Sequence, residues 1–261
     1  MRTPTSRGRR RHDSTTRSAR RLAGWATAGV IAALLGTTPA TAAAKATPGF
    51  YADASPGTTI GYQIYDHTNL IGGSSPRGTI AFKLYEPGDT TCQTPVFTAT
   101  VTVSGTGSDN SPNYITAAAG TYEWVAAYSG DDNNNPATTP CSSASQSVIV
   151  AKTTPVATTT ATLTNGAIHA TTALQWGFAP PTGTITFSVT GPNDPLCSGT
   201  PVYTSTVPVN GDGNYSSGSF TPTTPGIYTY RIRYSGDSNN YGIGPTSCLA
   251  TGAAVIVARA D

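Results

Sequence analysis

Alternation of apolar and polar residues is the dominant pattern along residues 78–257. The clearest example is the segment 228–234, which reads Tyr-Thr-Tyr-Arg-Ile-Arg-Tyr. Residues 80–84, 122–128 and 185–189 follow the same period, and clusters rich in Gly, Pro, Asp and Asn separate such segments. A period of two residues predicts strands with one buried face, and nothing in this range has the period of a helix.

The chain contains this pattern twice. Gly78-Thr-Ile-Ala-Phe recurs 105 positions later as Gly183-Thr-Ile-Thr-Phe, and Tyr128-Ser-Gly-Asp recurs at residues 234–237. A copy of about 105 residues has the size of one sandwich domain. We therefore expect an all-β protein with two tandem immunoglobulin-like antiparallel β-sandwich domains, residues 45–151 and 152–261, after an N-terminal signal peptide. The joint is expected at the Thr/Pro-rich residues 151–160, as a short and semi-rigid linker.

Three motifs resemble a known family. They are Gly-Thr-Ile-Thr-Phe after a Pro-containing turn, Ala/Pro-Gly-x-Tyr ending at Tyr122 and Tyr228, and Tyr-Ser-Gly-Asp-x-Asn-Asn ending at Asn240. Together they are similar to the bacterial immunoglobulin-like repeat domains (group 3) of secreted and cell-surface proteins. The resemblance implies the fold and an extracellular setting. It implies no single activity, because such domains occur as spacers, adhesion modules and appendages of enzymes.

Residues 1–44 have the layout of a secretory signal peptide. Eight arginines precede the nearly uncharged residues 22–36 and the small residues at 40–42. The apolar run of about 15 residues is shorter than the roughly 20 that a membrane-spanning helix needs. We expect the general secretory route, with the pair Arg20 and Arg21 leaving the twin-arginine route open. The mature protein is expected outside the cell without a membrane span, either released or held at the cell surface by a partner.

Composition and charge exclude several classes of protein. Charged residues make up only 11% of the chain, while Gly and Pro occupy 28 and 20 positions, which argues against coiled coils and other helical proteins. The formal charge of +2 belongs to the precursor, because residues 1–44 contain eight of the 15 basic residues and one of the 13 acidic residues. The mature part is therefore acidic, and we expect no nucleic-acid partner.

Four cysteines lie in the predicted mature part. An even number of cysteines in an exported protein predicts disulfides. Three pairings are formally open, and Cys92 with Cys141 and Cys197 with Cys248 is the economical choice, because both copies should fold alike. In the immunoglobulin strand order, the turns after the third strand and before the last strand lie at opposite ends. Each late cysteine therefore has to lie well along the last connection for the pair to meet.

The predicted mature part is poor in groups that serve catalysis. Its histidines, His67 and His169, have no histidine counterpart in the other copy, and a lone histidine on a strand is usually solvated or locally hydrogen-bonded. The sequence has no Gly-x-Ser-x-Gly, His-Glu-x-x-His or Cys-x-x-Cys motif. We therefore predict a protein without enzymatic activity.

Clustered Asp and Asn side chains suggest one hypothesis of metal binding. The residues concerned are Asp131, Asp132 and Asn133 in one copy and Asp237 and Asn239 in the other. Oxygen donors of this kind suit calcium, although Pro136 stands where an EF-hand loop needs glycine and no Glu closes the loop. The alternative is that these residues cap their own turns, as Asp and Asn commonly do. Calcium is the one cofactor considered, and otherwise none is expected.

Tyrosines suggest a hypothesis of carbohydrate binding, which uses exposed aromatic rings as a platform. The candidates are Tyr51, Tyr62, Tyr65 and Tyr85. The alternative is that these rings pack in the core or at its rim, since tyrosine is intermediate in burial. Tyr122 and Tyr228, each two residues after a glycine, are instead predicted to form tyrosine corners, in which the hydroxyl group binds the preceding backbone.

These observations predict a secreted, non-enzymatic structural or adhesive protein built from two disulfide-stapled immunoglobulin-like modules. A carbohydrate-binding module for cell-wall or other polysaccharides is the first alternative, and a calcium-stabilised spacer is the second. The expected partner is an extracellular protein or a glycan.

Overall fold

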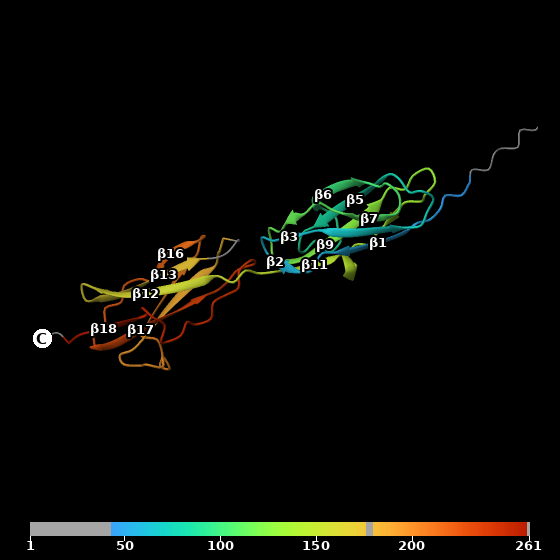
Figure 1. The fold of residues 1–261 in the computed structure, drawn as a ribbon. Coiled ribbons are helices and arrows are strands. Elements are labelled where there is room, and N and C mark those ends of the chain that lie inside the picture. The colour runs from blue at the N-terminus through green and yellow to red at the C-terminus, as the bar shows by residue number, and fades with distance from the viewer. Residues whose placement is uncertain (1–42, 176–179, 260–261) are drawn as a thin grey trace, which may run out of the picture. The chain divides into compact units, whose positions relative to one another are not determined.

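The structure is a computed structural model that describes residues 43–175 and 180–259 (Figure 1). The predicted signal peptide lies outside the described residues as far as residue 42. The described residues form strands joined by turns, and their one helical segment is the 3-10 turn η1 (Ala144–Gln146). The fold of these ranges is therefore all-β, as the alternation predicts. Nothing helical in the described residues has the length and hydropathy of a membrane span.

The first half of the structure, residues 45–151, contains two main sheets. Its strands are β1 (Gly49–Ala54), β2 (Thr58–Thr59), β3 (Gln63–Ile64), β4 (Asp66–Ile71), β5 (Thr79–Tyr85), β6 (Pro95–Thr102), β7 (Gly107–Asn110), β8 (Tyr114–Ile115), β9 (Gly120–Tyr128), β10 (Ala137–Thr138) and β11 (Ser147–Ala151). One sheet has the order β1-β4-β7, and the other has the order β2-β11-β9-β5-β6, with β10 beside β9. Strands β3 and β8 form a separate short pair. Pairing is antiparallel except between β2 and β11, which are parallel.

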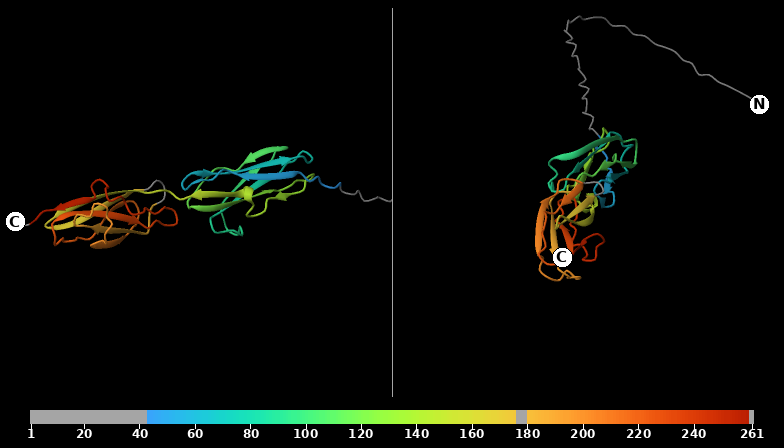
Figure 2. Two further views of the ribbon diagram at one scale, coloured as in Figure 1. Left: turned by 90° about the horizontal axis from the view of Figure 1, so that it is seen from below. Right: turned by 90° about the vertical axis from the view of Figure 1, so that its left-hand side faces the viewer.

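The second half, residues 152–259, has the same division into two sheets. Its strands are β12 (Val156–Thr164), β13 (Ala167–Gln175), β14 (Thr184–Thr190), β15 (Tyr203–Pro208), β16 (Gly213–Ser216), β17 (Gly226–Tyr234) and β18 (Ala254–Val257). The orders are β12-β13-β16 and β15-β14-β17-β18, and every pair is antiparallel. Figure 2 shows the strands of both halves from two further directions.

Each half has its own hydrophobic core, to which both of its sheets contribute. In the first half Leu70 of β4 is buried together with Phe82 of β5 and Trp124 of β9. In the second half Leu174 of β13 is buried with Phe187 of β14. The inward-facing positions along β9 and β17 are buried, as the alternation predicts. This two-layer arrangement is typical of β-sandwiches.

Both predicted tyrosine corners are confirmed. The Tyr228 hydroxyl donates to the carbonyl of Thr224 at 2.8 Å, and the Tyr122 hydroxyl accepts from the N–H of Ala118 at 3.0 Å. Each hydroxyl thus binds the backbone four residues upstream of the tyrosine, just before its strand begins. The bond fixes the crossover that leads into β17 or β9.

The predicted linker is mostly part of the second half, so its expected extent, residues 151–160, is wrong. Val156–Thr164 forms β12, and the preceding residues match the start of the first half. The Lys152 side chain donates to the carbonyl of Asp237 at 2.6 Å, and that of Lys45 donates to the carbonyl of Asp131, also at 2.6 Å. The similar sequences Ala-Lys-Ala-Thr-Pro at 44–48 and Ala-Lys-Thr-Thr-Pro at 151–155 are the signal for this correspondence.

The two halves differ where their first strand ends. In the first half β1 ends at Ala54, and Pro56 and Gly57 lead the chain to the other sheet, where β2 pairs with β11. Proline has no N–H to donate to a neighbouring strand, so Pro56 favours the end of the pairing between β1 and β4. The second half has no Pro-Gly pair at this place, and β12 stays paired with β13 for nine residues. As a result, β18 is the last strand of its sheet.

Asp66 carries the most deeply buried carboxyl group of the first half. Asp66 is fully buried, its Oδ1 accepts from Nε2 of Gln146 at 2.7 Å, and its Oδ2 has no hydrogen-bond partner in the described structure. Burial raises the pKa of Asp66 from 3.8 to about 6, because the charged form loses its hydration. Ala170 occupies the equivalent place in the second half, since its N–H binds Ser217 as that of Asp66 binds Ser111. The fold therefore does not require a carboxyl group here.

We predict that Asp66→Asn stabilises the protein in neutral and alkaline solution. The folded-state pKa is raised, so the favourable contribution of the protonated carboxyl is complete below pH 3.8 and is lost as the pH rises through about 6. At about pH 8 the substitution should raise the free energy of unfolding by about 1–3 kcal/mol, and near about pH 4 it should change little. Urea unfolding at both pH values measures this. Superimposable curves for the two proteins at the higher pH would contradict the prediction.

Candidate functional site

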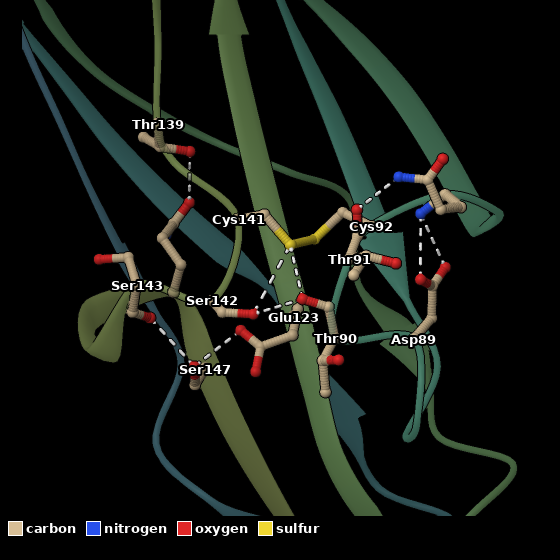
Figure 3. The surroundings of a disulfide bond; sticks show 12 residues. Asp89, Thr90, Thr91, Cys92, Glu123, Thr139, Cys141, Ser142, Ser143 and Ser147 are labelled. Carbon is tan, nitrogen blue, oxygen red and sulfur yellow. Dashed lines mark hydrogen bonds between the residues drawn. A yellow bond between two sulfur atoms is a disulfide. The ribbon is translucent and has the colours of Figure 1, made fainter.

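Both predicted disulfides are present, one in each half. The Sγ atoms of Cys92 and Cys141 are bonded, as are those of Cys197 and Cys248. In the first half the connection after β9 turns back and runs along β9, with β10 paired to that strand. Cys141 thereby reaches the end of the sheet at which Cys92 lies, as Figure 3 shows. Each late cysteine thus lies well along the last connection, as the predicted pairing requires.

An aspartate three residues before each early cysteine fixes the loop that carries it. The Asp89 carboxylate accepts from the N–H of Thr94 at 2.8 Å, and Asp194 binds the loop of the second half in the same way. Such backbone hydrogen bonds hold the pKa of both aspartates below the ordinary value. They brace a loop in which Cys92 and Cys197 have φ angles of 52° and 50°. Sequence reasoning missed both aspartates, although the repeated spacing Asp-x-x-Cys was available as a signal.

The predicted metal ligands Asp131 and Asn133 lie in a turn that the Asp131 carboxylate closes. Its Oδ1 accepts from the N–H of Asn133 at 2.7 Å. Its Oδ2 accepts from the N–H of Arg77 at 2.7 Å and from the Tyr128 hydroxyl at 3.1 Å. These hydrogen bonds, that from Arg77 first, hold the pKa of Asp131 well below its ordinary value. Both oxygens are therefore used to bind the protein itself.

Asp237 has the same surroundings in the second half. Its Oδ1 accepts from the N–H of Asn239 at 2.7 Å, and its Oδ2 accepts from the N–H of Thr182 at 2.6 Å and from the Tyr234 hydroxyl at 3.0 Å. Partial burial by itself would raise the pKa of Asp237. The hydrogen bonds from Thr182 and Asn239 outweigh it and hold this pKa well below its ordinary value. This geometry is that of the self-capped turn.

The remaining predicted ligand, Asp132, is exposed beside the first of these turns. Across residues 43–175 and 180–259, no three His, Cys, Asp or Glu side chains are grouped so that they could hold a metal ion.

Three of the four tyrosines considered as a carbohydrate platform are exposed. Tyr51 lies in β1, whereas Tyr62 and Tyr65 lie in the connections before and after β3. Tyr85 is only 5% exposed, so its interpretation as a ligand-binding residue is wrong. It lies at the end of β5 near the disulfide loop, and burial, followed by the charge of Asp89 in that loop, raises the pKa of its hydroxyl.

Tyr51, which is 61% exposed, lies along the outer face of the β1-β4-β7 sheet. A Cβ atom at Gly49 would be 3.2 Å from Cε2 of Tyr51, so the ring covers a position where glycine leaves room. On the same face of the sheet, two positions further along β1, Asp53 begins a polar row: Asp53 is opposite His67, and His67 is opposite Asn110. Nδ1 of His67 and Oδ1 of Asn110 are 2.6 Å apart. An exposed ring can stack on a sugar, and polar side chains on the same face can bind sugar hydroxyl groups.

The corresponding face of the second half has a different chemistry. The strand registers make Val156 equivalent to Gly49 and Thr158 equivalent to Tyr51. The polar row is replaced by Thr160, Thr171 and Ser216. Because the same sheet forms with these residues, the fold does not require a tyrosine above a glycine.

Comparisons with known proteins leave the family open. No protein-family model matches the chain, and no curated protein matches it. Among solved structures, red sea bream transglutaminase is similar at 11% identity and a TM-score of 0.35 over 82% of this chain. The chain covers only 31% of that transglutaminase. A DUF3823 family protein from Parabacteroides merdae is similar at 11% identity and a TM-score of 0.23, over 70% of this chain and 89% of its own. Likenesses this distant carry no argument about fold or function.

We predict that Asp131→Ala lowers the melting temperature, whereas Asp132→Ala leaves it near the wild-type value. The first substitution leaves the N–H groups of Arg77 and Asn133 without their acceptor, and the second removes an exposed side chain. Differential scanning calorimetry, with and without millimolar calcium, measures the effect. A calcium-dependent rise in the wild-type melting temperature that Asp131→Ala abolishes would show instead that the turn binds the cation.

Proposed function

We propose that the protein is exported and acts as a non-enzymatic structural or adhesive protein made of two related immunoglobulin-like modules. One observation carries the proposal: each half has its own hydrophobic core and its own disulfide. In both halves the disulfide joins the loop after the third main strand to the last connection. Such halves can unfold separately under load. The two disulfides support a role outside the cell, because these bonds persist in oxidising compartments.

The strand order supports the immunoglobulin-like assignment. In each half the first, second and fifth main strands form one sheet, β1-β4-β7 or β12-β13-β16. The third, sixth and last main strands form the centre of the other, β5-β9-β11 or β14-β17-β18. This division of six strands, with a tyrosine corner at the start of the sixth, resembles that of immunoglobulin sandwiches. The fourth strand, β6 or β15, differs from the constant-type pattern, because it pairs with the third strand and not in the sheet of the first. It also supports the resemblance to bacterial immunoglobulin-like repeat domains.

The first half has a contact suited to bearing tension. Strand β2 lies near the N-terminal end of this half, and β11 is its last strand. The two pair in parallel, and the N–H of Ile60 continues the pairing by donating to the carbonyl of Ala151 at 3.0 Å. Tension between the ends of the half would slide β2 along β11, so their hydrogen bonds would be loaded together. In the described residues of the second half β12 approaches β18, but no strand forms a parallel ladder with it.

Single-molecule force spectroscopy on residues 45–261 tests this role. We predict two separate unfolding events, with the first half unfolding at the higher force. Cys197→Ala/Cys248→Ala marks the second half, because it frees a loop with a sequence separation of 51 residues. At about 3.6 Å per residue the marked event lengthens by about 18 nm.

Cys92→Ala/Cys141→Ala marks the first half in the same way and is the matched control. The order of the forces should be the same in both marked proteins. One cooperative event, or a second half that is stronger in both, would contradict the proposed role.

A second candidate function is carbohydrate binding by the first half. The specific observation in its favour is the exposed Tyr51 ring above Gly49, on the sheet face that also carries the row of Asp53, His67 and Asn110. The partner would then be a polysaccharide of the cell wall or another extracellular glycan.

Pull-down with insoluble peptidoglycan, cellulose and chitin tests this candidate. If it is correct, wild type is retained by one of these probes, and Tyr51→Ala lowers the affinity by about tenfold, or about 1.4 kcal/mol. Tyr241→Ala is the matched control, because Tyr241 is 50% exposed but lies in the second half. Equal retention of wild type and Tyr51→Ala would contradict this function.

A further inference from the structure

The two halves differ in their electrical charge. Residues 45–151 contain eight acidic and three basic residues, whereas residues 152–261 contain four of each. The first half therefore has a formal charge of −5, and the second half is neutral. Because the summed field of a domain attracts ligands of the opposite sign, the first half favours cationic ligands over anionic ones.

Asp53 is an exposed carboxylate that the fold does not use. Asp89 and Asp131 of the same half bind backbone N–H groups, and Asp66 is buried. Asp53, in contrast, is exposed in β1, and its carboxylate makes no hydrogen bond with the described residues. Thr160 takes its place in the second half. The side chain of Asp53 can therefore bind a ligand without cost to the fold.

Asp53 and Tyr51 share the outer face of the β1-β4-β7 sheet. They are two residues apart in β1, so their Cα atoms are about 7 Å apart along the strand. The Tyr51 ring lies over Gly49, on the side away from Asp53. A glycan that contacts both side chains must therefore be longer than one sugar residue.

His67, which is opposite Asp53, adds a second hydrogen-bond acceptor. Its Nδ1 lies 2.6 Å from Oδ1 of Asn110, and an amide oxygen can only accept, so Nδ1 carries the proton. In the neutral ring Nε2 is then an acceptor. Strands β1, β4 and β7 contain no lysine or arginine, so no basic residue of this sheet neutralises the row. The row is suited to a ligand that donates hydrogen bonds and carries positive charge.

This inference rests on the carbohydrate-binding candidate and narrows its ligand. We propose that the face binds a polysaccharide with free amino groups, such as a polymer of deacetylated glucosamine. One sugar ring stacks on Tyr51, and the ammonium group of another donates to Asp53 and His67. Anionic polysaccharides are disfavoured, because they bring a like charge to Asp53.

Isothermal titration calorimetry of residues 45–261 with two soluble hexasaccharides tests the inference. One consists of glucosamine and the other of N-acetylglucosamine, so they share the sugar ring and differ in positive charge. At about pH 7 and low salt, wild type should bind the glucosamine hexamer about fivefold more tightly, which is the upper end of what an exposed ion pair contributes. High salt should reduce this preference.

Asp53→Asn should remove the preference, and Asp132→Asn is the matched control. Each substitution removes one negative charge from an exposed position of the first half, but Asp132 lies in the turn after β9. Asp53→Glu keeps the charge and should retain the preference. Tyr51→Ala should weaken the binding of both hexamers alike.

Equal affinity of wild type for the two hexamers would overturn the inference, and so would equal losses in Asp53→Asn and Asp132→Asn. Wild type that binds neither hexamer would also overturn it. In each of these cases, retention on cellulose or peptidoglycan that Tyr51→Ala abolishes would leave the candidate function intact.

Discussion

Each half depends on one constraint. The long connection after β9 or β17 has to turn back and run along the strand that precedes it. Neighbouring strands are antiparallel, so the chain leaves β9 or β17 at the end of the sheet opposite the early cysteine. The connection therefore has to run back before a disulfide can form. It is held at its start by the carboxylate of Asp131 or Asp237 and at its far end by the disulfide. These bonds take the place of a hydrophobic core that such a segment cannot build for itself.

The two halves share their interiors and differ at their edges and outer faces. Two residues, Pro56 and Gly57, send the first half across to the other sheet and close the edge of β11. Without them, the second half keeps a nine-residue first strand, and β18 is the last strand of its sheet. The outer sheet faces also differ, because Tyr51 of the first half is replaced by Thr158 in the second. The halves therefore differ mainly in features that the fold does not need.

Much of this architecture could be predicted from the sequence, because its signals are local or repeated. Period-two alternation identified the central strands, and the spacing from glycine identified Tyr122 and Tyr228. Repetition indicated the cysteine pairing. The alternation does not show what covers the outward face of a strand, so it left open whether Tyr85 is exposed or packed; it lies buried near the disulfide loop.

Two other features could not be found from local patterns. Strand β12 is rich in threonine on both faces, and it therefore resembled a linker. The pairing of β2 with β11 joins segments far apart in the chain, and a stretch of two residues carries no periodicity.

Peptide mapping of the purified protein without reduction tests the central claim, that each half is closed by its own disulfide. Trypsin cleaves after Lys83, Lys152, Arg231 and Arg233, so residues 84–152 contain Cys92 and Cys141 in one peptide. The account predicts that this peptide appears alone with an internal bond. It also predicts that residues 153–231 and 234–259 appear joined through Cys197 and Cys248. A bond between peptide 84–152 and either of the other two would contradict it.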